Sequence, residues 1–137
     1  MSSPVDPGSH EATHLREDVI AWLTTVTPEG TPQSTPVWFW WDGEGFLVYS
    51  RPGKPKLRNL QANPRVGLHM VGDPTGEEIV VFEGEASIDP DAPPSDRHEG
   101  YAEKYREAIG GLGLDPPRFA ALYSVPIRIR VTRARVE

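Results

Sequence analysis

The residues with the clearest chemical potential lie between Tyr49 and Arg65, in the segment YSRPGKPKLRNLQANPR. This segment holds five basic residues and no acidic residue, in a chain whose formal net charge is −6. A concentration of positive charge in an acidic chain is typical of a site for an anionic ligand. On charge alone, a solvated mixed surface remains the alternative. The basic residues are Arg51, Lys54, Lys56, Arg58 and Arg65.

The elements around this segment would place its charges together. Phe46–Ser50 and Arg65–Val71 are apolar runs that predict strands, and Lys54–Ala62 between them predicts a short helix. Leu57 and Leu60, three residues apart, would face the core. The N–H groups at the helix start and the basic side chains would then converge, which is an arrangement that binds phosphate.

A second basic block without acidic residues lies near the C-terminus, and there apolar and basic residues alternate. The alternation predicts a strand with one face in the core. Its other face would border water, an anion or a partner. The arginines of this block are Arg128, Arg130, Arg133 and Arg135.

The residues before the first basic segment predict further strands. The run VIAWLTTV (19–26) and the segment Gln33–Trp41 are separated by the turn Thr27-Pro28-Glu29-Gly30. With Phe46–Ser50 they predict an antiparallel meander of three neighbouring strands.

The residues after it predict a long strand and then helices. Ile79–Ile88 is interrupted by Gly84, which predicts a bulge. Residues 89–123 form a predicted helical insertion before the last strand. It would contain one helix over Ser95–Ile109, with Ser95 as its cap, and a second over Pro116–Leu122.

These elements predict one domain over residues 1–137, with residues 1–8 disordered. The fold class is mainly β (α+β), a six-stranded antiparallel barrel with a few short helices. Three tryptophans lie within four positions, at Trp38, Trp40 and Trp41 around Phe39. Strand alternation would send Trp38 and Trp40 to one face and Phe39 and Trp41 to the other. Either both faces of this strand would be buried, or one of them would stack on a flat ligand or a second subunit.

Composition excludes several classes of function. The chain has no cysteine, which excludes disulfides, thiolate metal sites and a cysteine nucleophile, and predicts a cytoplasmic protein. No apolar run approaches the roughly 20 residues of a membrane helix, and MSSPVDPGSH does not resemble a signal peptide. The sequence pI of 5.2 argues against binding of nucleic acid.

No side chain stands out as a catalyst. His10 and His14 are spaced to chelate a metal on a helix, but no third ligand is near, so no metal site is predicted. His69 is expected to be structural and His98 to lie on a solvated helix face. The catalytic residues are therefore unknown, and a bound organic cofactor would have to supply the chemistry.

Three ordered pieces of the chain resemble a known family. They are LTTVTPEGTPQSTPVWFWWDG, FLVYSRPGKPKLRNLQANPRVGLHM and VVFEGEASI. Together, over about residues 15–88, they resemble the pyridoxamine-5′-phosphate-oxidase-like split β-barrel superfamily, and especially its actinobacterial branch of coenzyme F-420-dependent enzymes. The ordered pair of Lys-x-x-Asn-Leu and Asn-Pro-Arg-Val is the specific signal. Glu29-Gly30 departs from the commoner Asp-Gly of this family.

The resemblance implies a homodimer with cofactor sites at its interface. It implies that Lys56, in Lys-x-x-Asn-Leu with Asn59, contacts the cofactor phosphate beside Ser50 and Arg51, with Lys54 as a further candidate. It also implies that a strand passes the flavin or deazaflavin ring and binds its polar edge through backbone groups. This strand consists of Thr35, Pro36, Val37 and Trp38.

Three functions remain open at this point. The first is a reductase that delivers hydride from reduced coenzyme F-420 to an electron-poor organic substrate, with the proton taken from solvent. The second is a flavin mononucleotide (FMN) oxidase or reductase. The third is a cofactor-binding or carrier protein without turnover. A basic helix together with an arginine-bearing last strand would suit the longer anionic tail of F-420 better than the single phosphate of FMN.

Overall fold

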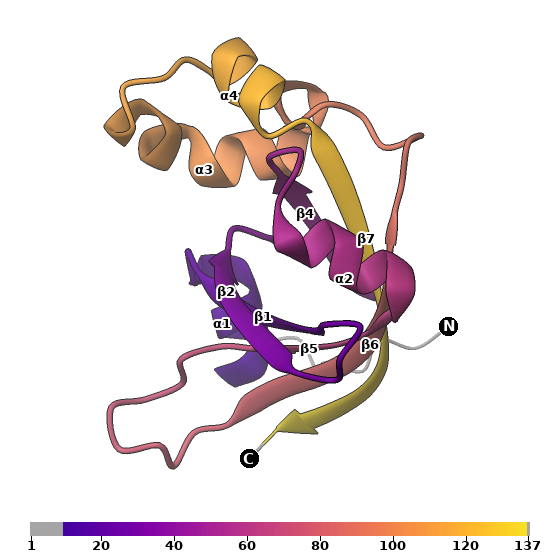
Figure 1. The fold of residues 1–137 in the computed structure, drawn as a ribbon. Helices are drawn as coiled ribbons and strands as arrows, with labels where there is room; N and C mark the ends of the chain where they lie inside the picture. The colour runs from indigo at the N-terminus through magenta and orange to yellow at the C-terminus, as the bar shows by residue number, and fades with distance from the viewer. Residues whose placement is uncertain (1–9, 137) are drawn as a thin grey trace.

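Short antiparallel strands form a curled sheet, and helices cover one end of it (Figure 1). The computed structural model describes residues 10–136. The predicted disorder of residues 1–8 lies outside these residues. The strands are β1 (Ala21–Val26), β2 (Pro32–Val37), β3 (Trp40–Trp41), β4 (Gly45–Ser50), β5 (Arg65–His69), β6 (Val80–Ile88) and β7 (Val125–Val136). The helices are α1 (His10–Glu17), α2 (Pro55–Ala62), the 3₁₀ turn η1 (Ser95–Arg97), α3 (Glu99–Gly111) and α4 (Pro116–Leu122).

The sheet has the strand order β2-β1-β5-β6-β7-β4-β3, so its two end strands, β2 and β3, are consecutive in the chain. Only Trp38 and Phe39 connect them. The sheet must therefore curl until its ends meet, without a ladder of hydrogen bonds across the join. The expected antiparallel split barrel is confirmed, with seven strands within residues 10–136 in place of the six predicted.

The seventh strand arises because the predicted strand Gln33–Trp41 is broken at Phe39. The Phe39 N–H donates to the Tyr105 hydroxyl at 2.8 Å, and the Phe39 carbonyl oxygen accepts from Lys104 Nζ at 3.2 Å. Helix α3 thus takes the backbone groups that a neighbouring strand would need. The predicted three-strand meander is wrong for the same reason: β2 pairs with β1, whereas β4 pairs with β3 and β7.

Strand β6 carries the predicted bulge. Its register against β7 shifts between Glu83 and Gly84. A Cβ atom at Gly84 would lie 2.5 Å from the carbonyl oxygen of Arg130, so the close approach of the two strands requires glycine.

Two hydrophobic cores share the segment from Trp38 to Trp41. Phe39 and Trp41 belong to the core inside the curled sheet, which also buries Leu57 and Leu60 of α2 as predicted. Trp38 and Trp40 pack instead in a second core between the sheet and the helices. The predicted alternation of these four residues is confirmed.

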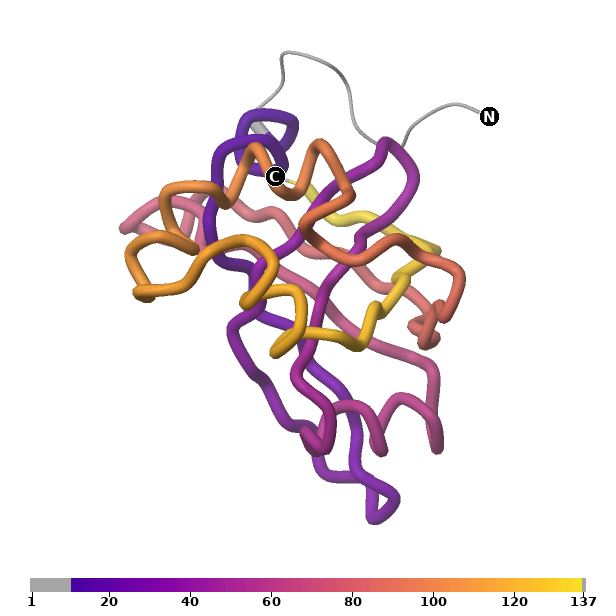
Figure 2. The backbone as a smooth tube through the Cα atoms, turned by 90° about the horizontal axis from the view of Figure 1, so that it is seen from above, coloured from indigo at the N-terminus to yellow at the C-terminus, as the bar shows by residue number. Residues whose placement is uncertain are grey.

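Helices α3 and α4 lie together across one end of the sheet, as the view from above shows (Figure 2). The helix predicted from Ser95 begins later, because Ser95 starts the η1 turn and α3 runs from Glu99 to Gly111. His98 caps α3, since its Nδ1 accepts from the Tyr101 N–H at 3.0 Å. The prediction that His98 lies on a solvated helix face is therefore wrong. No helix in the described part of the chain is long and apolar enough to cross a membrane.

Candidate functional site

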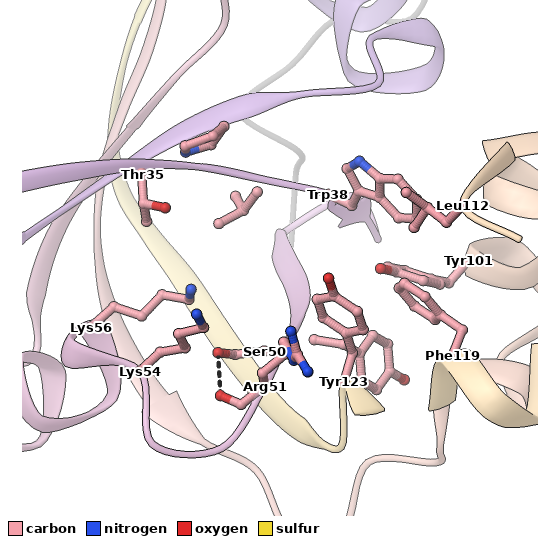
Figure 3. Close-up of a pocket in the computed structure, with 13 residues that line it drawn as sticks. Thr35, Trp38, Ser50, Arg51, Lys54, Lys56, Tyr101, Leu112, Phe119 and Tyr123 are labelled. Atoms are coloured by element: carbon pink, nitrogen blue, oxygen red, sulfur yellow. Dashed lines mark hydrogen bonds between the residues drawn. The ribbon is translucent and has the colours of Figure 1, made fainter. Parts of the chain in front are cut away.

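A cavity of about 340 Å³ lies between β2, the end of β4, the start of α2 and the helices α3 and α4 (Figure 3). It joins segments that are far apart in the sequence. Eight of the nine residues predicted to bind a cofactor line it. They are Thr35, Pro36, Val37, Trp38, Ser50, Arg51, Lys54 and Lys56.

One end of this cavity is basic. Figure 3 shows the amino groups of Lys54 and Lys56 side by side and directed into it. Neither lysine forms an ion pair with any described residue, and neither does Arg51. Burial, together with repulsion from Lys54, lowers the pKa of Lys56 below the ordinary value of 10.5. Since an anion placed here would relieve that repulsion, the basic end is suited to bind one.

The turn before α2 supports the same end of the cavity. Ser50 is buried, and its hydroxyl donates to the carbonyl oxygen of Arg51 at 2.9 Å. The Arg51 guanidinium lies over the Tyr123 ring, 5.8 Å from its centroid. Helix α2 begins with Pro55, and no side-chain hydrogen bond from the N-cap residue Lys54 caps its N-terminus. The positive end of the helix dipole adds to the charge of the lysines.

A second cavity of about 390 Å³ adjoins the same two lysines. It shares Thr35, Lys54 and Lys56 with the first cavity and adds the polar side chains of Gln33 and Ser34. The two lysines therefore adjoin further polar groups that a ligand longer than a single phosphate could contact.

Asn59, the ninth predicted residue, does not line either cavity. Its side chain is buried, and its Nδ2 donates to Thr25 Oγ1 at 3.0 Å and to Gln33 Oε1 at 2.9 Å. Asn59 thus holds α2 against the β1–β2 hairpin. Its observed contacts position the lysines and Gln33 around the site.

The other end of the cavity is aromatic. The Trp38 ring stacks on Tyr105 at 4.7 Å and on Phe119 at 5.3 Å, measured between centroids. Phe119 stacks in turn on Tyr123 at 4.4 Å. The result is a column of stacked rings that reaches from α3 to the guanidinium of Arg51.

Sequence reasoning did not assign to the site the residues that the helices contribute, namely Tyr101, Leu112, Phe119 and Tyr123. The spacing of aromatic residues in the sequence does indicate such a wall. Tyr101 and Tyr105 are four residues apart on α3, and Phe119 and Tyr123 are four residues apart across the end of α4. Such spacing places each pair on one helix face, which can form the wall of a cavity.

The second basic block lies elsewhere. Arg128 pairs with Asp42 at 3.3 Å and with Asp89 at 3.6 Å, and Arg130 pairs with Glu85 at 2.8 Å. These arginines do not line the cavity, and their charges are matched by carboxylates on neighbouring strands and turns. The expectation that the last strand helps to bind a long anionic tail therefore has no support from this cavity.

The cavity suits a ligand with a flat ring and an anionic arm. The aromatic end can contact the ring, and the unpaired cations can bind the arm. Strand β2 is an end strand of the sheet, so part of its backbone has no strand partner and can hydrogen-bond the ring edge. The lining has no carboxylate or histidine to act as an acid or base. Within residues 10–136, no cluster of histidine and acidic side chains is arranged to hold a metal.

Comparison with known proteins shows the family to which the chain is related. The family model for pyridoxamine 5′-phosphate oxidase matches residues 9–134. A solved structure described as an F-420 reductase is 30% identical, covers 96% of this chain and 98% of its own, and has a TM-score of 0.72.

More distant solved structures share the fold. A FAD-binding protein from Mesorhizobium loti is 19% identical, with 90% of this chain and 87% of its own covered, and a TM-score of 0.65. HutZ, a heme storage protein from Vibrio cholerae, is 21% identical, with 92% of each chain covered, and a TM-score of 0.64. No curated protein matches the sequence. The chain belongs to the pyridoxamine 5′-phosphate oxidase family of split β-barrel proteins.

Proposed function

We propose that this protein is a reductase that uses reduced coenzyme F-420 to deliver hydride to an electron-poor organic substrate. The observation that carries the proposal is the set of cations at the basic end of the cavity. Arg51, Lys54 and Lys56 have no carboxylate partner among the described residues, and a second polar cavity shares the two lysines. The 30% identical F-420 reductase supports the choice of cofactor.

Each part of the cavity would have a defined task. Lys54, Lys56 and Arg51 would bind the anionic tail, and the second cavity would receive its further carboxylates. The backbone of Thr35–Val37 would bind the polar edge of the ring. When bound, the cofactor supplies hydride from the ring carbon that replaces flavin N5. Trp38 and the aromatic wall would hold the substrate over that ring and keep water away. Solvent would supply the proton.

Two other functions are each supported by one observation of the site. An FMN enzyme is compatible with the site because its single phosphate would also fit the two lysines. A non-catalytic cofactor carrier is compatible because no carboxylate or histidine lines the cavity. The second cavity favours F-420, since FMN would leave it empty.

Titration of the purified protein with F-420 and with FMN tests the proposal. We expect micromolar or tighter binding of F-420, seen as a change in its fluorescence, and weaker binding of FMN. Tight FMN binding without F-420 binding would contradict it. Oxidation of reduced F-420 by enones, quinones or tetrapyrroles would separate an enzyme from a carrier, because a carrier binds F-420 without turnover.

We also propose that the protein is a homodimer. Large apolar side chains are exposed before and along β1 and after β5: Val19 is 50%, Ile20 41%, Trp22 36% and Val71 70% accessible. A second copy would bury this surface and close the cofactor sites. Light scattering coupled to size-exclusion chromatography checks this, and a monomer at micromolar concentration would contradict it. A cytoplasmic location stays a prediction that rests on the absence of cysteine.

A further inference from the structure

Three buried tyrosines lie next to the aromatic end of the cavity, and one of them differs from the other two. The Tyr49 hydroxyl donates to the carbonyl oxygen of Pro93 at 2.6 Å. The Tyr105 hydroxyl accepts from the Phe39 N–H and lies 2.8 Å from the carbonyl oxygen of Val19. The Tyr101 hydroxyl has no hydrogen-bond partner among the described residues.

The position of Tyr101 points to the cavity as the source of its partner. The side chain is 0% exposed and packs against the rings of Tyr49 and Tyr105, each at 4.8 Å between centroids. Tyr101 also lines the cavity, and Figure 3 shows its hydroxyl end directed toward the space beside Trp38. The neighbouring rings supply no acceptor, and the hydroxyl itself is closed to water, so a ligand can supply the acceptor only where it displaces the side chains that cover the hydroxyl.

An unpaired buried hydroxyl costs folding free energy, so its presence calls for an explanation. Burial raises the pKa of Tyr101 far above its ordinary value, which keeps the group protonated at physiological pH. It can therefore donate a hydrogen bond but cannot serve as a base. Ser95 Oγ is also buried without a partner among the described residues, but Ser95 does not line the cavity. This serine offers a matched comparison.

We propose that the Tyr101 hydroxyl recognises the substrate by donating a hydrogen bond to a carbonyl-type oxygen conjugated with the carbon that is reduced. This inference rests on the proposed function, and it narrows the substrate class to planar compounds such as enones and quinones. In an enone, hydride adds to the β-carbon, and the π-electron pair moves toward the oxygen. A solvent proton completes the two-electron reduction. Tyr101 keeps its proton and stabilises the charge that develops on the oxygen.

Binding of two matched probes to the cofactor-free protein tests this inference. The probes are 2-acetylnaphthalene and 2-ethylnaphthalene, which differ in one carbonyl group, and isothermal titration calorimetry measures both. We expect the wild type to bind the ketone about 10-fold more tightly than the hydrocarbon. Tyr101→Phe should remove most of this preference and leave the melting temperature unchanged or higher. Ser95→Ala should leave the preference intact.

Two results would overturn the inference. One is a wild type without preference for the ketone, and the other is a Tyr101→Phe variant that keeps the full preference. Because the measurement uses no F-420, the preference for the ketone can be interpreted even if the protein does not bind F-420. A melting temperature at or above that of the wild type shows that the Tyr101→Phe variant is folded.

Discussion

The Phe39 N–H donates to the Tyr105 hydroxyl at 2.8 Å at the place where the chain passes from β2 to β3. The same hydroxyl lies 2.8 Å from the Val19 carbonyl oxygen, next to β1. Helix α3 therefore supplies the polar groups that close the join between the two ends of the sheet. Trp38, the residue before Phe39, lines the cavity, so this contact also positions the wall of the site.

Loss of that hydroxyl should destabilise the fold. Tyr105→Phe leaves the buried N–H of Phe39 without an acceptor, and we expect the free energy of unfolding to fall by about 1–3 kcal/mol. Urea denaturation measures the change. Tyr123→Phe is the control, because this partly exposed hydroxyl can bond water, and its effect should stay within about 0.5 kcal/mol. Equal effects of the two variants would contradict the structural role of Tyr105.

Gly100 of α3 lies against the Trp40 ring of β3, and this contact requires glycine. A Cβ atom at Gly100 would overlap the Trp40 indole, so Gly100→Ala should destabilise the protein by about 1–3 kcal/mol. Gly110, in the same helix, has no atom within 4 Å of such a Cβ. Gly110→Ala should therefore stabilise the helix by about 0.5–1 kcal/mol. Melting temperatures that move in the same direction for both variants would argue against this packing.

Asn59 should act on folding more than on ligand contact. Asn59→Leu leaves Thr25 Oγ1 and Gln33 Oε1 without their donor, and we expect a loss of about 1–3 kcal/mol in the free energy of unfolding. Cofactor affinity should fall less than in Lys56→Ala. A variant of normal stability with affinity as low as that of Lys56→Ala would show instead that Asn59 contacts the ligand directly.

Lys56 should matter for binding and little for stability. Lys56→Ala should weaken F-420 binding about 10- to 100-fold, because it removes one cation from the anion site. Stability should change little, because Lys56 has no ion pair with a described residue to lose. Fluorescence titration measures the affinity, and thermal unfolding checks the fold. Arg130→Ala removes an equal charge from the Glu85 pair outside the cavity and should bind normally. Unchanged affinity in Lys56→Ala would move the anion site elsewhere.

Lys104 should make stability depend on pH. Burial, partly opposed by Asp18, lowers the pKa of Lys104 to about 8, whereas in the unfolded chain it is about 10.4. Between these values the unfolded state binds more protons, so the Lys104 contribution to the free energy of unfolding rises with pH, by about 1–2 kcal/mol from pH 8 to 10.

Lys104→Met removes this titration. Urea denaturation at several pH values measures the free energy of unfolding of both proteins. The value for the wild type minus that for the variant should increase from pH 8 to pH 10. A difference that is constant over this interval would show that Lys104 titrates normally in the folded protein.

Several features followed from local patterns alone. The alternation of residues 38–41 predicted which rings face which core, and Leu57 and Leu60 predicted the buried face of α2. Gly84 predicted the bulge in β6. These predictions hold because side-chain direction repeats every two residues in a strand and about every 3.6 residues in a helix, whatever the rest of the fold does.

Other features could not be read locally. The first part of Gln33–Trp41 pairs with β1 and the last part with β4, and no local pattern predicts this change of partner. The strand is interrupted by contacts with α3, which lies more than 60 positions away in the sequence. The arginines of β7 have the same charge as Lys54 and Lys56. Only their carboxylate neighbours on other strands and turns show that their charge is matched.

The sequence by itself determined that a basic turn and short helix follow a strand, and that an aromatic strand precedes them. Residue type and short-range spacing are sufficient for both. The tertiary structure decided that these segments share a cavity, that Asn59 supports it from inside, and that Tyr101 lines it with an unpaired hydroxyl. Hydrogen-bond satisfaction and charge pairing depend on which distant residues meet, and that is settled only when the chain folds.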